Sequence, residues 1–269
     1  MNTNFKFLLI GTNLSLIPNI TYAQCTTTPN CAEMGYKETA NKGGCLKCPV
    51  GNGWYCPDPK EEKAVLGECT GYAKNCSIGQ ILNSDGTCTT DKVSGKTPLG
   101  VIIAIKDNCG WAMTANPIQK DIMWSVYNPV IADLTDYNTW QEAAKDYNSC
   151  DNTQKIILSG GADKFPAAWE AVNYTPNTAQ ETKGKWCLPA AGLLTSLYSN
   201  LNVIDSTISK LNGTKLSENV EWIWSSSERS SAYAWHFSYY PNTNGSNGIY
   251  WNAKNYNTIN STVRPVIAF

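Results

Sequence analysis

The sequence predicts an α+β domain preceded by a small disulfide-rich segment. Eight of the 11 cysteines lie within the first ninety residues, and the other three are scattered through the rest of the chain. From residue 97 onward, short β-branched runs alternate with stretches of helical periodicity. Apolar residues make up 42% of the chain, with 10 Trp and 14 Tyr, which is enough hydrophobic surface for a core and excludes generic disorder.

The first 23 residues have the pattern of an export signal. One positive charge, at Lys6, precedes a mainly apolar stretch over residues 7–20, and Thr21–Ala23 places small residues at the cleavage position. We expect cleavage after Ala23 and a protein that is secreted, periplasmic or on the cell surface; a buried N-terminal strand is the alternative. No later stretch approaches 18 consecutive apolar residues, so we expect no transmembrane segment after signal removal.

Residues 24–96 form a predicted cysteine-rich stalk, with the domain boundary near residues 89–98. The stalk has few aliphatic residues, so we expect its stability to depend on disulfides. Cys45 and Cys48 have the spacing of half a zinc site, but no second pair follows, and an exported chain meets oxidising conditions. We therefore favour disulfides and leave their connectivity open. Because 11 is odd, at least one thiol stays free or pairs between chains.

The stalk also contains a degenerate repeat and two turn sequences. Gly35-Tyr36 precedes one pair of cysteines, and Gly71-Tyr72 precedes another. Gly51–Gly53 and Asn83–Gly86 are typical of turns, which predicts short hairpins joined by disulfides. A plain spacer is the alternative.

The domain over residues 97–269 begins with a predicted pair of strands and continues with three predicted helices. Gly100–Ile105 predicts a buried strand, and residues 110–114 return beside it. The first helix begins with the capping-box spacing Thr139–Glu142, the second with Pro189, and the third stops at Gly213. The apolar residues expected to share a face are Trp140, Ala143, Ala144 and Tyr147, then Leu193, Leu194, Leu197, Tyr198 and Leu201, then Ile204, Ile208 and Leu211.

The end of the chain has the composition of a binding surface. Between residues 225 and 262, 20 of 38 positions are Asn, Ser or Tyr, and the only charged residues are Glu228, Arg229 and Lys254. Tyr offers a stiff contact area that ends in a hydroxyl, and Asn and Ser offer adaptable donors and acceptors. A disordered low-complexity tail is the alternative, but large apolar residues at intervals favour an ordered surface: Trp222, Trp224, Trp235, Phe237, Ile249 and Trp251.

The alternation of side chains along a strand selects the predicted contacts. If Trp235, Phe237 and Tyr239 face inward, the residues between them face solvent. Residues 241–248 then form a loop before a strand over residues 249–252. The predicted binding residues are Tyr233, His236, Ser238, Tyr240, Asn242, Asn244, Asn247, Tyr250, Asn252, Asn255, Tyr256 and Asn257.

Four motifs, in this order, carry a family resemblance: Trp186–Gly192, Trp224–Glu228, Ala234–Trp235 and Val263–Val266. The set resembles bacterial C-type-lectin-like domains, specifically those at the C-terminus of a collagen-like adhesin and in the variable proteins of diversity-generating retroelements, over residues 97–269. The family has Glu where this chain has Leu193, so one of its polar contacts is missing here. The resemblance implies a small twisted antiparallel sheet, two or three helices and a loop-rich binding face.

Two further expectations rest on the resemblance. In retroelement proteins, adenine-directed mutagenesis acts on codons like those of Asn, so diversification is a hypothesis for Asn242, Asn244, Asn247, Asn252, Asn255, Asn257 and Asn260. Glu228 and Arg264 belong to motifs at the two ends of the variable stretch, and a guanidinium can take a carboxylate through two hydrogen bonds. We therefore expect these two residues to pair and to fix the last strand.

Several kinds of partner are disfavoured. Twenty-one basic against 22 acidic residues, with only two Arg, leave no basic stripe for nucleic acid. The arrangement Pro241-Asn242 and Trp251-Asn252 is a poor match to a calcium-dependent sugar site, because Ala253 stands where an acid is needed. With one histidine, His236, we expect no enzyme activity, no cofactor and no metal.

The sequence therefore predicts an exported ligand-binding or adhesion protein that recognises a glycan or a protein through its C-terminal domain. A structural envelope protein is one alternative. The other is an oxidoreductase like the formylglycine-generating enzymes, for which Cys109, Cys150 and Cys187 are the candidate cysteines. The ligand and the oligomeric state stay open.

Overall fold

The computed structural model describes residues 63–69, 71–218, 221–239, 248–256 and 260–269, and the backbone of three short strands nearer the N-terminus. The chain divides into two compact units, residues 1–62 and 63–269. In the first unit, an antiparallel sheet has the order β1 (Tyr36–Thr39), β3 (Trp54–Pro57), β2 (Leu46–Lys47). The export signal, the Cys45 and Cys48 pair and the turn at 51–53 lie outside the described residues.

The division between the units lies after residue 62, so the boundary predicted near residue 96 is wrong. Strand β4 (Ile81–Asn83) pairs with β6 (Pro98–Lys106) in one sheet, and a disulfide joins Cys69 to Cys109. The density of cysteines suggested a stalk that reaches residue 96. Three of those cysteines instead belong to disulfides of the larger unit, so residues 63–96 are part of its fold.

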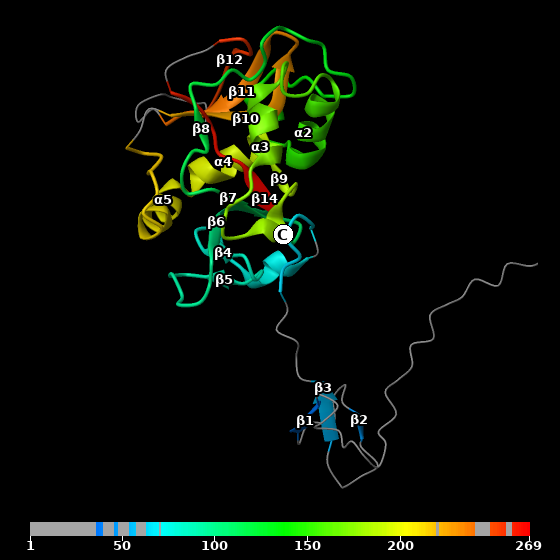
Figure 1. The fold of residues 1–269 in the computed structure, drawn as a ribbon, viewed down its shortest axis with the longest axis vertical. Helices are drawn as coiled ribbons and strands as arrows, with labels where there is room; N and C mark the ends of the chain where they lie inside the picture. The colour runs from blue at the N-terminus through cyan, green and yellow to red at the C-terminus, as the bar shows by residue number, and fades with distance from the viewer. Residues whose placement is uncertain are drawn as a thin grey trace, which may run out of the picture. The chain divides into compact units, whose positions relative to one another are not determined.

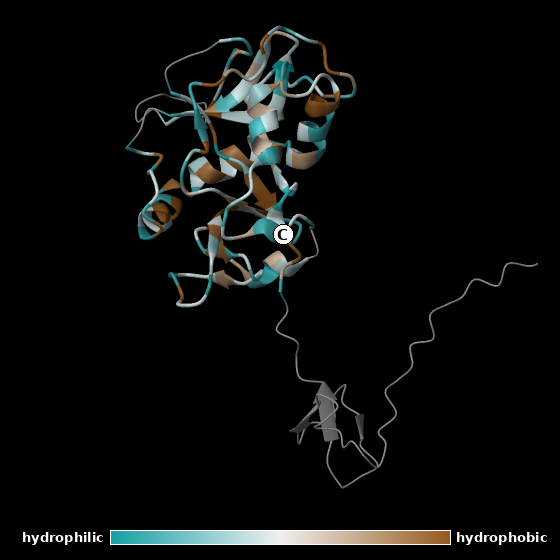
Figure 2. Cartoon of the chain, viewed as in Figure 1, coloured by the Kyte–Doolittle hydropathy of each residue, from teal (hydrophilic) through white to brown (hydrophobic). Residues whose placement is uncertain are grey.

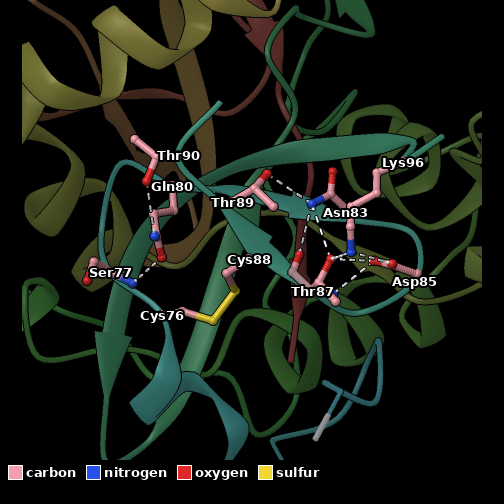
Figure 3. The surroundings of a disulfide bond; sticks show 10 residues. All are labelled: Cys76, Ser77, Gln80, Asn83, Asp85, Thr87, Cys88, Thr89, Thr90 and Lys96. Atoms are coloured by element: carbon pink, nitrogen blue, oxygen red, sulfur yellow. Dashed lines mark hydrogen bonds and ion pairs between the residues drawn. A yellow bond between two sulfur atoms is a disulfide. The ribbon is translucent and has the colours of Figure 1, made fainter. Parts of the chain in front are cut away.

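The hairpin of β4 and β5 (Cys88–Thr89) is closed by the predicted turn and joined to Cys76 through the Cys76–Cys88 disulfide (Figure 3). Gly86 has a φ of +79°, a left-handed conformation that favours glycine. The Asp85 carboxylate accepts hydrogen bonds from the Thr87 backbone N–H at 3.1 Å and from Lys96 Nζ at 2.8 Å. Partial burial raises the pKa of Asp85, but the hydrogen bonds from Lys96 and Thr87 outweigh it and lower this pKa to about 2.

A six-stranded antiparallel sheet forms one layer of the larger unit, in the order β5-β4-β6-β7-β14-β9. Its other strands are β7 (Cys109–Met113), β9 (Trp186–Cys187) and β14 (Val266–Ala268). The predicted strand pair at residues 100–114 is confirmed as β6 and β7. The ring of Phe269, the last residue, lies against Gly110, where any Cβ would overlap it.

A five-stranded sheet forms a second layer, in the order β12-β11-β10-β13-β8. Strands β10 and β13 run parallel, and the other pairs are antiparallel. The predicted strand at residues 249–252 is confirmed as β12, which lies at one edge of the sheet. The bounds are β8 (Gln119–Lys120), β10 (Trp222–Ser230), β11 (Tyr233–Phe237), β12 (Ile249–Ala253) and β13 (Ser261–Val263).

The α-helices of the larger unit are α1 (Trp140–Ala143), α2 (Ser149–Leu158), α3 (Pro166–Asn173), α4 (Ala191–Ser199) and α5 (Leu201–Lys210). Helix α4 lies between the two sheets and packs against β6 on one side and β10, β11 and β12 on the other (Figure 1). None of the helices in the described residues combines the length and apolar character needed to cross a bilayer. The α+β fold class is thus confirmed. Two features differ from the expectation: α2 and α3 were not predicted, and the larger unit has two sheets where one was expected.

The three predicted helices correspond to α1, α4 and α5, with differences at their ends. The capping box of α1 is present, since Thr139 and Glu142 exchange side-chain to backbone hydrogen bonds, but the helix ends at Ala143. Asn212, at a φ of +56°, supplies the left-handed stop after α5. Two short 3₁₀ helices, η1 (Tyr72–Asn75) and η2 (Gln180–Thr182), complete the unit, so the second copy of the predicted repeat is helical whereas Tyr36 begins a strand.

The core of the larger unit is most apolar around the six-stranded sheet and α4. Figure 2 shows brown segments in these elements and paler or teal segments in β10 and β11. Helix α4 is buried on most sides, and a Cβ at its Gly192 would meet the backbone oxygen of Asp146. This close contact brings the sequence motif Trp186–Gly192 against the segment after α1.

Two segments cross side by side from one sheet to the other. Residues 114–118 connect β7 to β8, and Arg264 and Pro265 connect β13 to β14. The Ile118 N–H donates to the Val263 oxygen at 2.9 Å, and the Thr114 N–H donates to the Pro265 oxygen at 3.2 Å. The crossing segments therefore hold the two sheets together.

Arg264 lies fully buried at this crossing, and its partner is Glu221 rather than the predicted Glu228. Its Nε and Nη2 donate to the two carboxylate oxygens of Glu221 at 2.8 and 2.7 Å. Its Nη1 donates to the Ala115 oxygen, and Nη2 also donates to the Thr214 oxygen. The parallel register of β10 and β13 explains the correction, because it brings the start of β10, next to Glu221, alongside β13.

Glu228 lies near the other end of the nine-residue strand β10 and pairs with Lys254. Both side chains are buried, and Lys254 Nζ also lies 4.6 Å from the centre of the Trp124 ring. Burial lowers the pKa of Lys254 to about 7, and the charge of Asp136 opposes this change. The pair fixes the residue after β12 against the interior.

Candidate ligand-binding site

The structure describes seven of the twelve predicted binding residues, and these seven have different environments. His236 and Ser238 are buried, Tyr233, Tyr250 and Asn252 are half-buried, and Asn255 and Tyr256 are exposed. The other five, Tyr240, Asn242, Asn244, Asn247 and Asn257, lie outside the described residues.

The prediction that His236 and Ser238 face solvent is wrong. Strand β11 lies inside the sheet, and both of its faces are covered. Trp235 and Phe237 pack in the apolar cluster that contains α4, whereas Ala234 packs in the cluster on the opposite face. Side chains therefore alternate between two buried environments, and the alternation does not distinguish inside from outside.

His236 is an internal residue that packs against aromatic rings. Trp222 stacks on the imidazole with a centroid distance of 5.0 Å, and Trp224 lies edge-on at 5.8 Å. Burial lowers the pKa of His236 to about 4, although the Phe237 carbonyl opposes this shift. The imidazole is thus neutral at pH 7 and contributes to packing.

An open groove of about 490 Å³ lies where the start of α1 faces the edge of the five-stranded sheet. Of the predicted binding residues, it includes Tyr250. We call it the aromatic groove; its lining residues are Asn138, Thr139, Trp140, Gln141, Trp235, Ile249, Tyr250 and Trp251.

Trp251 is the exposed aromatic residue of this groove. The residue is 47% exposed, whereas Trp235, directly opposite on β11, is 3% exposed. The Tyr233 ring lies almost perpendicular to that of Trp251, with a centroid distance of 4.8 Å. The Arg229 guanidinium lies 4.3 Å from the centre of the Trp251 ring. These neighbours hold Trp251 in place although nearly half of it is exposed.

The other wall of the aromatic groove is anchored through the backbone. The Tyr137 N–H donates to the Glu228 oxygen at 2.9 Å, and the Trp235 indole N–H donates to the Tyr137 oxygen at 3.0 Å. The capping box then fixes Thr139 at the start of α1. As a result, the amide side chains of Asn138 and Gln141 are exposed at the groove on an anchored segment.

Two of the four sequence motifs, Trp186–Gly192 and Trp224–Glu228, meet in a buried polar network. The Ser227 hydroxyl donates to Asp146 Oδ2 at 2.6 Å and accepts from the Ala191 N–H at 2.8 Å. Asn152 Nδ2 donates to the same Asp146 oxygen at 2.8 Å. The Ser226 N–H donates to the Pro189 oxygen at 2.8 Å. The motif residues therefore join α2, α4 and β10 and lie away from solvent.

The groove combines apolar rings with neutral hydrogen-bonding groups. Such a surface can hold a ligand that has both apolar faces and hydroxyl groups. Within the described parts of the chain, no three His, Cys, Asp or Glu side chains gather as a metal ion requires. The three candidate cysteines for redox chemistry are all in disulfides. Cys109 is bonded to Cys69, and Cys150 is bonded to Cys187.

Sequence reasoning missed the wall formed by residues 138–141. These residues are about a hundred positions from β11 and β12, so no local pattern links them to the tail. The one signal was Trp140, which we assigned to the buried face of a helix. It is only half-buried, because α1 is a single turn and leaves the ring at the groove.

No family model matches the chain, and no curated protein matches it. Among solved structures, it is similar to a fimbrial protein from Bacteroides ovatus ATCC 8483, with 14% identity and a TM-score of 0.45, over 72% of this chain and 49% of that one. The chain thus spans about half the length of that protein.

Proposed function

We propose that the larger unit is a binding module that recognises a glycan in the aromatic groove. The observation that carries this proposal is the environment of Trp251, which is nearly half exposed yet held by Tyr233 and Arg229. A fixed ring loses little conformational entropy on binding, so its apolar area contributes fully to affinity. Sugars present an apolar ring face together with hydroxyls, which match the ring of Trp251 and the amides of Asn138 and Gln141.

The binding module is also proposed to be a C-type-lectin-like domain of the bacterial branch and to act outside the cytoplasm as an adhesion or ligand-binding protein. In support of this family, two of its motifs, Trp186–Gly192 and Trp224–Glu228, are joined by buried hydrogen bonds around Asp146. Supporting export, the larger unit contains three disulfides among its described residues, and disulfides persist in oxidising compartments. The disulfides of Cys109, Cys150 and Cys187 count against the oxidoreductase alternative.

Diversification of the tail stays a separate prediction. Of the seven candidate asparagines, Asn252 is half-buried and Asn255 and Asn260 are exposed, and the other four lie outside the described residues. Sequencing sibling copies of the gene checks it: we expect changes concentrated at these codons, and scattered synonymous changes contradict it.

The test of glycan binding uses the purified full chain on a glycan array, followed by titration calorimetry with the best ligand found. Trp251→Ala is expected to weaken binding at least about tenfold, because aromatic anchors at the centre of a site carry much of the free energy. The matched control is Trp169→Ala, which removes a 39% exposed tryptophan from α3, outside the groove.

Two results overturn the proposal. One is the absence of any glycan bound by the unmodified protein. The other is equal loss of affinity in the Trp251 and Trp169 variants, which would make the effect nonspecific. Thermal melting of both variants verifies that each is folded, and we expect little change because both rings are substantially exposed.

A further inference from the structure

The chain has two arginines, and the structure gives them opposite environments. Arg264 is fully buried, and its guanidinium donates to Glu221 and to two backbone oxygens. Arg229 is half-buried, and its described contacts are with the rings of Trp251 and Tyr233, at 4.3 and 5.9 Å. Its Nε is buried and has no hydrogen-bond partner among the described residues.

The neighbouring carboxylate does not neutralise Arg229. Glu228, the preceding residue, pairs instead with the buried Lys254. Between residues 225 and 262 the chain has no other charged residue. Within the part of the chain that the structure describes, no carboxylate lies within ion-pair distance of Arg229.

Stacking also fixes the orientation of this charge. A guanidinium on an aromatic face retains its hydrogen-bonding edge, and because its rotamers are already restricted, it loses less entropy when it binds an anion. Trp251 links Arg229 to the aromatic groove, because its ring contacts the Arg229 guanidinium and also lines the groove. Arg229 does not itself line the groove, so a ligand in the groove reaches this cation at the Trp251 ring that both contact.

We propose that Arg229 is an anion subsite and that the aromatic groove takes acidic glycans, in which a sugar carboxylate lies beside the Trp251 ring. This inference rests on the proposed glycan binding and names its substrate class. The guanidinium of Arg229 provides paired N–H donors for a planar carboxylate, which becomes the ion-pair partner that Arg229 lacks among the described residues. The sugar ring itself contacts Trp251 and the amides of the opposite wall.

The experiment compares matched ligands that differ only in charge. The purified full chain is applied to an array of uronate-containing and sialylated glycans, each printed beside its carboxyl methyl ester. We expect esterification to weaken binding at least about tenfold at low salt, and we expect added NaCl to reduce binding of the acid but not of the ester.

Variants assign this preference to Arg229. Arg229→Gln is expected to bind acid and ester equally, at the level of the ester in the unmodified protein. Arg229→Lys keeps the charge but loses the planar fork, so an intermediate preference is expected. Trp251→Ala is expected to weaken binding of acid and ester alike. Thermal melting verifies that each variant is folded.

The outcomes separate this inference from the proposed function. If the unmodified protein binds acid and ester equally, or if Arg229→Gln keeps the preference for the acid, the anion subsite is wrong while glycan binding stands. If Trp251→Ala binds both ligands normally, or if no glycan binds, the proposed function is wrong as well.

Discussion

The two sheets of the larger unit are stabilised by different chemistry. In the six-stranded sheet, β6, β7 and β14 are buried almost entirely through apolar side chains. In the five-stranded sheet, β10 is equally buried but contains three consecutive serines and Glu228. A buried polar group needs a partner, and the partners of β10 come from distant segments, as Asp146 and Lys254 do. The first sheet therefore depends on packing, and the second on specific pairs.

The largest expected difference concerns Arg264. Arg264→Met is expected to reduce the free energy of unfolding by about 3–5 kcal/mol, because it leaves the Glu221 carboxylate buried without a partner. In the six-stranded sheet, Ile102→Val removes one buried methylene from β6 and is expected to cost about 1 kcal/mol. Urea denaturation measures both.

The double variant Arg264→Met, Glu221→Gln is the control for that comparison. We expect it to recover part of the lost stability, because no uncompensated charge remains. Equal effects of Arg264→Met and Ile102→Val would contradict the idea that the crossing depends on a specific ion pair.

The next largest effect is a pH dependence from His236, the only histidine. Its pKa is lowered to about 4 in the folded chain, against about 6.5 when unfolded, so the unfolded state binds the proton first. The contribution of neutral His236 to the free energy of unfolding is therefore fully present above pH 6.5. It is lost as the pH falls from 6.5 to 4, by at most about 3 kcal/mol. Urea denaturation at several pH values measures this slope.

His236→Gln provides the matched variant, because it keeps a polar side chain without a titrating group in this range. We expect the stability of this variant to change less between pH 6.5 and pH 4. Asp85, whose pKa is lowered to about 2, contributes mainly below pH 4 and does not account for the same slope. An unchanged slope in the variant would place the titration elsewhere.

The smallest effects compare two adjacent serines of β10. Ser227→Ala removes hydrogen bonds to Asp146 and Ala191 and is expected to cost about 1–3 kcal/mol. The Ser226 hydroxyl is buried with no hydrogen-bond partner in the described structure, so Ser226→Ala is expected to be neutral or slightly stabilising. Thermal melting measures both variants. Equal losses of stability would show that the hydrogen bonds of Ser227 do not account for the effect of Ser227→Ala.

Helix α2 shows why sequence patterns predicted some elements and missed others. Its buried positions, Ser149, Asn152, Thr153 and Ile156, have helical spacing, but three of the four are polar. Ser149 and Thr153 accept hydrogen bonds from the N–H groups of Ala190 and Leu188. Hydrophobic periodicity therefore missed this helix, whereas it identified α4 and α5, whose buried positions are mostly Leu, Ile and Ala.

The residues of the candidate site were likewise predicted in part and missed in part. The composition of the tail pointed to β11 and β12, and Tyr250 does line the groove. The choice of outward residues failed at His236 because a strand covered on both faces has no solvent side. Trp251 was absent from the predicted contacts, yet its position at the edge strand β12 leaves it exposed.

The sequence alone determined the α+β class, the strands of the six-stranded sheet around residues 100–113 and the helices α4 and α5. These elements follow from apolar periodicity, turns and caps, which act over a few neighbouring residues. Only the tertiary structure decided that Arg264 pairs with Glu221, that Lys254 pairs with Glu228, and that residues 138–141 face Trp251. Each of these contacts joins segments distant in the chain, and several residues of the required charge or polarity could have served as partner, so the choice depended on how the two sheets cross.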